Sequence, residues 1–206
     1  YSSWSLRGWL ALARTGLAFE EIVVPLDMPE THAAIAAFSP SAKLPLLRHG
    51  DVTVWESLAV GEYLAEIAPE ARLWPEDRRA RAHARAVAAE MHAGFMSLRV
   101  QCPMNVRASK PGRPISPETA ADIQRIAAIW RDCRTRFGQG GDMLFGHFTI
   151  ADAMYAPMVS RFRTYGITLD AVSETYAAAV WALPELRRWS RAADVEPWAI
   201  PRYDAV

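Results

Sequence analysis

Cysteine is scarce in this sequence: its 206 residues include only Cys102 and Cys133. Small secreted domains that depend on disulfides carry more cysteines at closer spacing, so this class is excluded. We therefore expect two reduced thiols and a cytoplasmic protein. The five histidines are scattered, and no group of them stands at the spacing of metal ligands. We accordingly predict no metal.

The sequence also lacks a charge excess and a long apolar run. Lys and Arg together number 23, as do Asp and Glu, so the formal net charge is zero. Nucleic acids and anionic membrane surfaces attract clustered positive charge, and we therefore expect neither as a partner. No apolar run reaches the roughly 20 residues of a membrane-spanning helix. The remaining composition, 51% hydrophobic and 22% charged, is typical of a globular protein.

Residues 1–70 alternate between helical and strand patterns. Apolar residues recur at helical spacing after the opening serines, and Gly16 stands where this helix would end. Residues 18–26 are rich in β-formers and predict a strand. The other elements that we predict are a helix in 29–38, a hairpin in 44–57 turning at 49–51, and a helix in 56–69. With a further strand that we expect ahead of Tyr1, the pattern predicts an α/β unit around a four-stranded mixed sheet.

The strand signal ends after this unit. Residues 71–79 are rich in proline and charge and predict a linker, and residues 80–206 predict an all-helical domain. Ser116 and Pro117 are typical of a helix start, and Thr149 with Asp152 matches a capping box. The helices that we predict run over 80–101, 116–137, 148–165, 169–183 and 184–195.

Two short segments carry groups that suit a peptide-like ligand. If the Leu44–Pro45 bond is cis, the Leu44 N–H and C=O point outward together and can pair with an extended peptide. A trans proline at the start of an edge strand is the alternative. Ser57 opens a helix whose free N–H groups suit a carboxylate, and Glu56 suits an ammonium group. The alternative here is a plain N-cap beside an exposed acid.

The opening serines, Ser2, Ser3 and Ser5, allow two interpretations. Hydroxyl side chains are preferred caps at helix starts. Alternatively, one hydroxyl holds a reactive group in an active site. The residues of this segment alone leave both interpretations open.

The order of the segments resembles the cytosolic glutathione transferases. The resemblance covers essentially the whole chain: "SPSAKLPLL" and "WES" in an α/β unit, a linker, then a helical domain with "FTIAD". The segments "SSWSLR" and "EMHAGFMSLRVQCPMNVR" resemble the zeta class and its bacterial relatives. Trp4 stands where zeta enzymes usually have cysteine, and Glu56 where they usually have glutamine. The resemblance implies a thioredoxin-like domain lacking its first strand here, glutathione as co-substrate, and a homodimer.

The resemblance also implies site residues. Ser2 would contact the glutathione thiol, with Ser3 and Ser5 as competitors and Ser5 the favoured N-cap. The residues implied for glutathione binding are Lys43 at the glycyl carboxylate, Leu44 and Pro45 at the cysteinyl backbone, and Glu56 and Ser57 at the γ-glutamyl end. An electrophile pocket between the domains would involve Trp4, Met91, Phe95, Met104 and Arg163. Core packing is the alternative for both methionines and for Phe95.

The implied activity is a glutathione transferase whose bound thiolate attacks a small electrophile. A cysteine thiol has a pKa of about 8.5 in water, so little of it is thiolate at neutral pH. A hydroxyl that donates to the sulfur, together with the amino end of a helix, stabilises the thiolate. The alternatives are a glutathione-dependent isomerase or dehalogenase of zeta type, and a non-catalytic ligand-binding protein of the same fold.

Overall fold

The computed structural model describes residues 1–205. Its first helix, α1 (Ser3–Thr15), follows Ser2, which is the N-cap. The Ser2 hydroxyl accepts a hydrogen bond from the backbone N–H of Ser5 at 3.1 Å. The helix ends at Gly16, whose φ of +74° is a left-handed conformation that glycine adopts without a Cβ clash. The predicted helix is therefore confirmed, but its capping residue is Ser2 and not Ser5.

The sheet is smaller than predicted. Strand β1 (Leu46–His49) pairs antiparallel with β2 (Val52–Trp55), with Leu47 opposite Val54, and within residues 1–205 this two-stranded sheet stands alone. The predicted strand over 18–26 is wrong, because this segment has irregular backbone and leaves Ile22 76% exposed. A strand needs a neighbouring strand to bond with, and no strand among residues 1–205 pairs with this segment.

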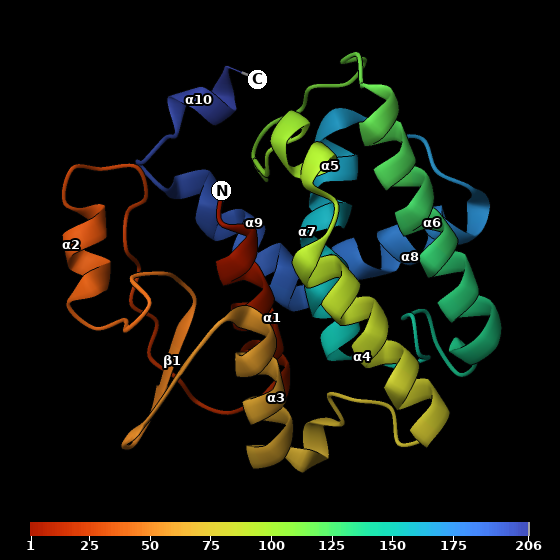
Figure 1. Ribbon diagram of the computed structural model, residues 1–206, viewed down its shortest axis with the longest axis horizontal. Helices are drawn as coiled ribbons and strands as arrows, with labels where there is room; N and C mark the ends of the chain where they lie inside the picture. Colours follow the sequence, from red (N-terminus) through yellow and green to blue (C-terminus); the bar gives the residue numbers. More distant parts are fainter. Residues whose placement is uncertain (206) are drawn as a thin grey trace.

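Two helices complete the N-terminal part. Helix α2 (Thr31–Ala36) precedes the irregular loop 39–45, and α3 (Ser57–Ile67) follows the hairpin, both as predicted. A short 3-10 helix, η1 (Pro69–Ala71), leads toward the helical part. In Figure 1, α2 and the hairpin lie on one side of the molecule, α4 to α8 lie on the other, and α1 and α3 lie between them.

The helical part departs from the prediction in three places. The helix predicted over 80–101 is broken into α4 (Arg78–Ala93) and α5 (Met96–Gln101), because Gly94 is extended and Phe95 is left-handed with φ +64°. Helix α4 begins inside the predicted linker, where the Asp77 carboxylate accepts from the Ala80 N–H at 2.8 Å. A last short helix, α10 (Pro201–Asp204), was not predicted.

The other long helices follow the prediction. They are α6 (Pro117–Phe137), α7 (Ile150–Tyr165), α8 (Ala171–Ala182) and α9 (Pro184–Val195). Helix α7 is buried along almost its whole length and packs against α1, α4 and α8. A Cβ atom at Gly61 of α3 would lie 3.1 Å from the Ile150 side chain, so this glycine lets α3 approach α7 closely. Within residues 1–205 no helix is both long and apolar enough to cross a bilayer.

The start of α7 is fixed by a buried carboxylate. Asp152 is fully buried and accepts hydrogen bonds from the backbone N–H of Thr149 at 2.7 Å, from its hydroxyl at 3.0 Å, and from the Leu144 N–H at 3.0 Å. The predicted capping box is therefore confirmed. Because the Leu144 bond reaches outside the helix, the same side chain also anchors the loop that enters α7.

We expect Asp152→Ala to lower the free energy of unfolding by about 2–4 kcal/mol, because it leaves three buried donors without an acceptor. Asp152→Asn retains one carbonyl oxygen and should cost less. The exposed Asp194 of α9 provides the control, and Asp194→Ala should change stability by no more than about 0.5 kcal/mol. Urea unfolding measures all three variants. Equal losses for Asp152→Ala and Asp194→Ala would contradict this account.

Candidate active site

The predicted site residues come together where α1 begins. A Cβ atom at Gly8 would lie only 3.0 Å from Cγ of Pro45, so α1 and the 39–45 loop are in close contact. One turn earlier on α1, the Trp4 ring packs edge-on against His92 of α4, with centroids 5.1 Å apart. His92 Nε2 lies 3.8 Å from a carboxylate oxygen of Glu56, at the start of α3. One chain of contacts therefore links Pro45, the start of α1 and the start of α3.

The three serines have different surroundings. Ser2 is half-buried, caps α1, and donates its hydroxyl hydrogen to Ser5 Oγ at 2.8 Å. Ser3 is buried, and its Oγ accepts from the guanidinium of Arg161 in α7 at 3.5 Å. Ser2 therefore combines partial exposure with a place at the amino end of α1, where the helix dipole favours negative charge. These contacts support Ser2 as the thiol-contacting residue, which stays a prediction.

The start of α3 holds an unpartnered hydroxyl beside a strained residue. Ser57 is 2% exposed, and its Oγ has no hydrogen-bond partner among residues 1–205. A buried polar atom without a partner is unfavourable in a protein interior and often marks a place for a ligand. Glu56 precedes it with φ +69° and ψ 127°, a conformation that L-residues rarely adopt. Its side chain stays exposed and is directed toward His92.

The 39–45 loop presents the other predicted glutathione contacts. The Leu44–Pro45 bond is cis, the possibility that the sequence left open. Lys43 is exposed, and its backbone carbonyl accepts from the hydroxyl of buried Ser39 at 2.8 Å, which ties the loop to its own start. An exposed lysine ammonium on such a loop suits a carboxylate, which it would meet as a point charge.

The predicted pocket residues are less concentrated. Met91 and Met104 are 0% and 1% exposed and Phe95 is 7% exposed, so all three pack in the hydrophobic core, which is the alternative stated above. Arg163 lies on the exposed side of α7, with its guanidinium carbon 4.8 Å from the centroid of the Trp181 ring. Trp4 is 36% exposed at the junction between α1 and α4. Of the five, Trp4 is the one whose position suits a pocket between the domains.

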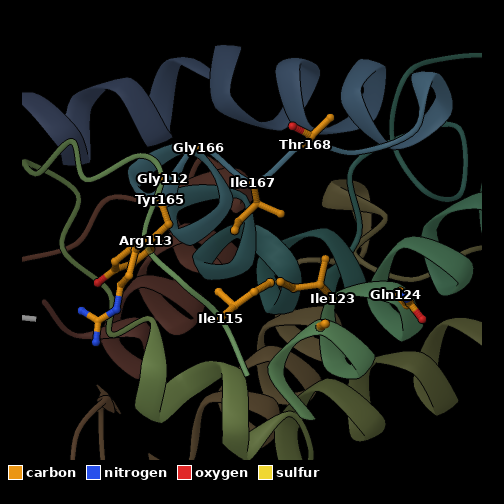
Figure 2. Close-up of a pocket in the computed structure, with 10 residues that line it drawn as sticks. Gly112, Arg113, Ile115, Ile123, Gln124, Tyr165, Gly166, Ile167 and Thr168 are labelled. Atoms are coloured by element: carbon orange, nitrogen blue, oxygen red, sulfur yellow. The ribbon is translucent and has the colours of Figure 1, made fainter. Parts of the chain in front are cut away.

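A cavity of about 350 Å³ lies elsewhere, between the start of α6 and the end of α7. Ile115, Ile123 and Ile167 point toward one another across it, with Arg113 and Gln124 at its two ends (Figure 2). None of the predicted site residues lines this cavity.

Several charged residues at the site were not singled out by the sequence reasoning. Arg7 of α1 is 1% exposed and lies 4.5 Å from the centroid of the Trp4 ring. Burial lowers the pKa of Arg7 well below its usual range, and the charges of Arg99 and Arg161 lower it further. Burial also lowers the pKa of His92, again assisted by Arg7. A signal was present, since Arg7 follows Ser3 by four residues and thus shares the buried face of the helix.

Across residues 1–205 no three His, Cys, Asp or Glu side chains gather closely enough to hold a metal ion. Cys102 and Cys133 are both buried and unpaired. Burial raises the pKa of the Cys133 thiol to about 12, which makes this side chain a poor nucleophile at neutral pH.

A small sheet-and-helix unit with a cis proline, followed by a helical domain, defines the glutathione transferase class of fold. The family model described as "Glutathione S-transferase, N-terminal domain" matches residues 1–67. The model described as "Glutathione S-transferase, C-terminal domain" matches residues 116–192. This chain belongs to the glutathione S-transferase family.

Relatives of this chain include zeta-class enzymes. A probable maleylacetoacetate isomerase of Caenorhabditis elegans is 26% identical over 185 residues, which are 85% of this chain and 83% of that protein. The maleylacetoacetate isomerase of Rattus norvegicus is 31% identical over 101 residues, 47% of this chain and 45% of that protein.

Solved structures share the fold. One is a holo maleyl pyruvate isomerase, described as a bacterial glutathione S-transferase in the zeta class. Its TM-score is 0.72 at 25% sequence identity, and the match covers 97% of this chain and 96% of that chain. Another is a glutathione transferase homologue from Burkholderia with bound glutathione, with a TM-score of 0.70, 24% identity, and coverage of 95% and 94%.

The backbone of Glu56 supplies a test of strain at the site. We expect Glu56→Gly to unfold at higher urea than Glu56→Ala, with a free energy of unfolding about 1 kcal/mol greater, because glycine adopts a positive φ without a Cβ clash. Both variants lose the same carboxylate, so their difference isolates the backbone. If the alanine variant is the more stable of the two, Glu56 is not strained.

Proposed function

We propose that this protein is a glutathione transferase that binds glutathione and ionises its thiol for attack on a small electrophile. The observation that carries the proposal is that the starts of α1 and α3, each with a serine, are linked by the contacts of Trp4 with His92 and of His92 with Glu56. Ser2 caps α1 with a half-buried hydroxyl, and Ser57 opens α3 with a buried hydroxyl that has no partner among residues 1–205. Both helix starts offer free N–H groups and a dipole that favours anions.

Each part of glutathione has a matching group. The γ-glutamyl carboxylate suits Ser57 and the amino end of α3, and the γ-glutamyl ammonium suits the Glu56 carboxylate. The cysteinyl backbone suits Leu44, whose cis bond to Pro45 is held against α1 at Gly8. The glycyl carboxylate suits the exposed ammonium of Lys43. This assignment places the cysteinyl sulfur toward the start of α1.

The Ser2 hydroxyl must change its partner in order to act on the sulfur. In the structure it donates to Ser5 Oγ at 2.8 Å and accepts from the Ser5 N–H at 3.1 Å. A hydroxyl has one hydrogen to donate, so Ser2 turns its O–H from Ser5 to the thiolate. The Ser5 hydroxyl then turns its own hydrogen to Ser2 Oγ. Two donors to Ser2 Oγ make its O–H a stronger donor to the sulfur.

The reaction is attack by the thiolate sulfur on an electrophilic carbon. The sulfur supplies the electron pair of the new C–S bond, and a leaving group departs with the pair of the broken bond. Each unit by which the site lowers the thiol pKa corresponds to about 1.4 kcal/mol of preference for the thiolate. One charge-assisted hydrogen bond and a helix dipole supply free energies of this size.

We further propose a homodimer in a reducing, cytoplasmic setting. The homodimer rests on the family to which the chain belongs. The reducing setting rests on two buried cysteines that form no disulfide.

A second candidate activity is a glutathione-dependent isomerisation of zeta type. It is favoured by the relatives and the solved structure named as maleylacetoacetate and maleyl pyruvate isomerases. In such a reaction the thiolate adds to the substrate and is expelled again, so glutathione is not consumed. Product analysis with a chlorinated acid and with a maleyl-type acid separates the two activities: conjugation consumes the thiol, whereas isomerisation leaves its concentration unchanged.

We expect Ser57→Ala to weaken glutathione binding by at least tenfold, because the hydroxyl is buried beside the place proposed for the γ-glutamyl carboxylate. Ser2→Ala should leave binding within about threefold but raise the pKa of the bound thiol by about 1–2 units. Calorimetry measures the first effect, and the absorbance of the bound thiolate over pH measures the second. An unchanged thiol pKa in Ser2→Ala would remove Ser2 from the catalytic role.

Ser5 provides a separate test of the hydroxyl chain. Ser5→Ala removes the hydroxyl that accepts from Ser2 in the structure and that we propose donates to Ser2 Oγ when the thiolate is bound, but it keeps the backbone N–H that Ser2 caps. We expect a smaller rise in the thiol pKa than for Ser2→Ala, about 0.5 units. An effect as large as that of Ser2→Ala would mean that Ser5 contacts the sulfur itself.

A further inference from the structure

Two buried arginines and one half-buried arginine lie next to the serine segment. Arg7 of α1 and Arg161 of α7 are 1% and 4% exposed, and Arg99 of α5 lies 5.1 Å from the same Trp4 ring that Arg7 contacts. The charges of Arg99 and Arg161 act on Arg7, and the charge of Arg99 acts on Arg161. We call these residues the arginine cluster.

The cluster has hydrogen bonds but no carboxylate partner among residues 1–205. Arg161 donates to the carbonyl oxygens of Cys102 at 2.9 Å and Pro157 at 3.2 Å. Arg99 donates to the carbonyl oxygens of Gly94 at 2.8 Å and of Met91. Arg7 donates from Nε to the Met154 carbonyl at 3.2 Å, but its two terminal nitrogens are buried without a partner.

Buried positive charge without a counter-ion is costly, and its persistence calls for an explanation. Carbonyl oxygens satisfy hydrogen-bond donors but do not neutralise their charge, whereas an anion does both. Burial lowers the pKa of Arg161 to about 10, which still leaves it protonated at neutral pH. The interior beside α1 therefore carries a positive potential that an incoming anion would relieve.

The arginine cluster lies beside the opening serines. Arg161 Nη2 lies 3.5 Å from Ser3 Oγ, and Arg7 stands one turn after Ser3 on the same buried face of α1. The positive end of the α1 dipole is at the same place. A thiolate held by Ser2 would thus lie one residue from the serine that Arg161 contacts.

We propose that Arg7 and Arg161 act as a buried positive centre that stabilises the glutathione thiolate at Ser2, with the thiolate serving as the missing counter-ion. This inference rests on the proposed function. The arginines act through space and do not donate a proton, so no bond is made or broken in this step. Ser3 is a positioning residue, because its hydroxyl accepts from Arg161 and holds that guanidinium at the start of α1.

Other charged groups face this centre from each packed element. The carboxylate of Glu56, the N-cap of α3, lies 3.8 Å from His92 of α4. Asp122 of α6 acts on Arg99, while the phenol groups of Tyr155 and Tyr165 in α7 act on Arg7 and Arg161. None of these carboxylates forms an ion pair with Arg7 or Arg161 within residues 1–205, so the positive potential is not cancelled.

The decisive experiment is the pH titration of the bound glutathione thiolate in four proteins: the unaltered chain, Arg161→Met, Arg161→Lys and Arg191→Met. Arg191 is the control, because it is an exposed arginine of α9 with no part in the proposed site. We expect Arg161→Met to raise the thiol pKa by about 1 unit. Arg161→Lys keeps the charge and should retain most of the effect, and Arg191→Met should change nothing.

Two further measurements keep the inference testable if Arg161→Met does not fold. Arg7→Met should fold, since only one hydrogen bond from Arg7 is lost. Because it also removes a buried positive charge, it should raise the thiol pKa by a similar amount. In the unaltered protein, the pKa of the bound thiol should be nearly independent of salt up to about 1 M, because buried charges are poorly screened. A thiol pKa that rises with salt toward its value in water would assign the effect to surface charges and overturn the inference.

The outcomes separate this inference from the proposed function. Bound glutathione with an unshifted thiol pKa in the unaltered chain would defeat the proposed function itself. A lowered pKa in the unaltered chain that stays equally low in Arg161→Met and Arg7→Met would leave the transferase proposal intact and defeat the role of the cluster.

Discussion

Helix α1 packs against α3 in its own domain and against α7 in the helical domain, and the site depends on this double contact. Two glycines allow further close approaches around it. A Cβ atom at Gly8 of α1 would lie 3.0 Å from the Pro45 ring, and one at Gly61 of α3 would lie 3.1 Å from the Ile150 side chain of α7. Gly8 thus lets α1 pack against the loop with the cis proline, and Gly61 lets α3 pack against the helical domain.

Around that position the protein keeps several unfavourable local arrangements. Glu56 has a positive φ, Ser57 has a buried hydroxyl without a partner, and Arg7 has buried guanidinium nitrogens without a partner. Each feature alone destabilises the fold, and the surrounding packing must compensate for it. All three lie within one chain of contacts at the start of α1 and α3. Such concentration is expected of a binding site, where polar groups are prepared for a ligand and not for one another.

The buried carboxylate of Asp152 shows the opposite design. Its oxygens accept from three donors within the protein, and it lies at the start of the most buried helix. Here a polar group serves the fold, because it accepts from backbone and hydroxyl groups at the start of α7 and in the loop that enters this helix. The contrast with Ser57 separates a structural helix start from one that is available to a ligand.

Much of this could be predicted from local patterns. The starts of α6 and α7 follow from Ser116 and from the Thr149–Asp152 capping box, because N-caps are local interactions. The hairpin follows from its alternating residues and turn. The break at Gly94 and Phe95 was missed, because apolar spacing continues across it and only packing forces Phe95 into a left-handed conformation. The strand over 18–26 failed for the converse reason: β-forming residues make a strand only when a neighbour pairs with them.

The sequence by itself determined the order of elements, the family and the residue types of the site, since these depend on periodicity, caps and short motifs. Tertiary structure decided which serine is the cap, where Met91 and Met104 lie, and that Arg7, Arg99 and Arg161 form one cluster. Those arginines stand on three different helices, far apart along the chain. Their mutual repulsion and lack of carboxylate partners arise only when the helices pack, because Coulomb interactions depend on distance in space and on burial, neither of which is written in the local sequence.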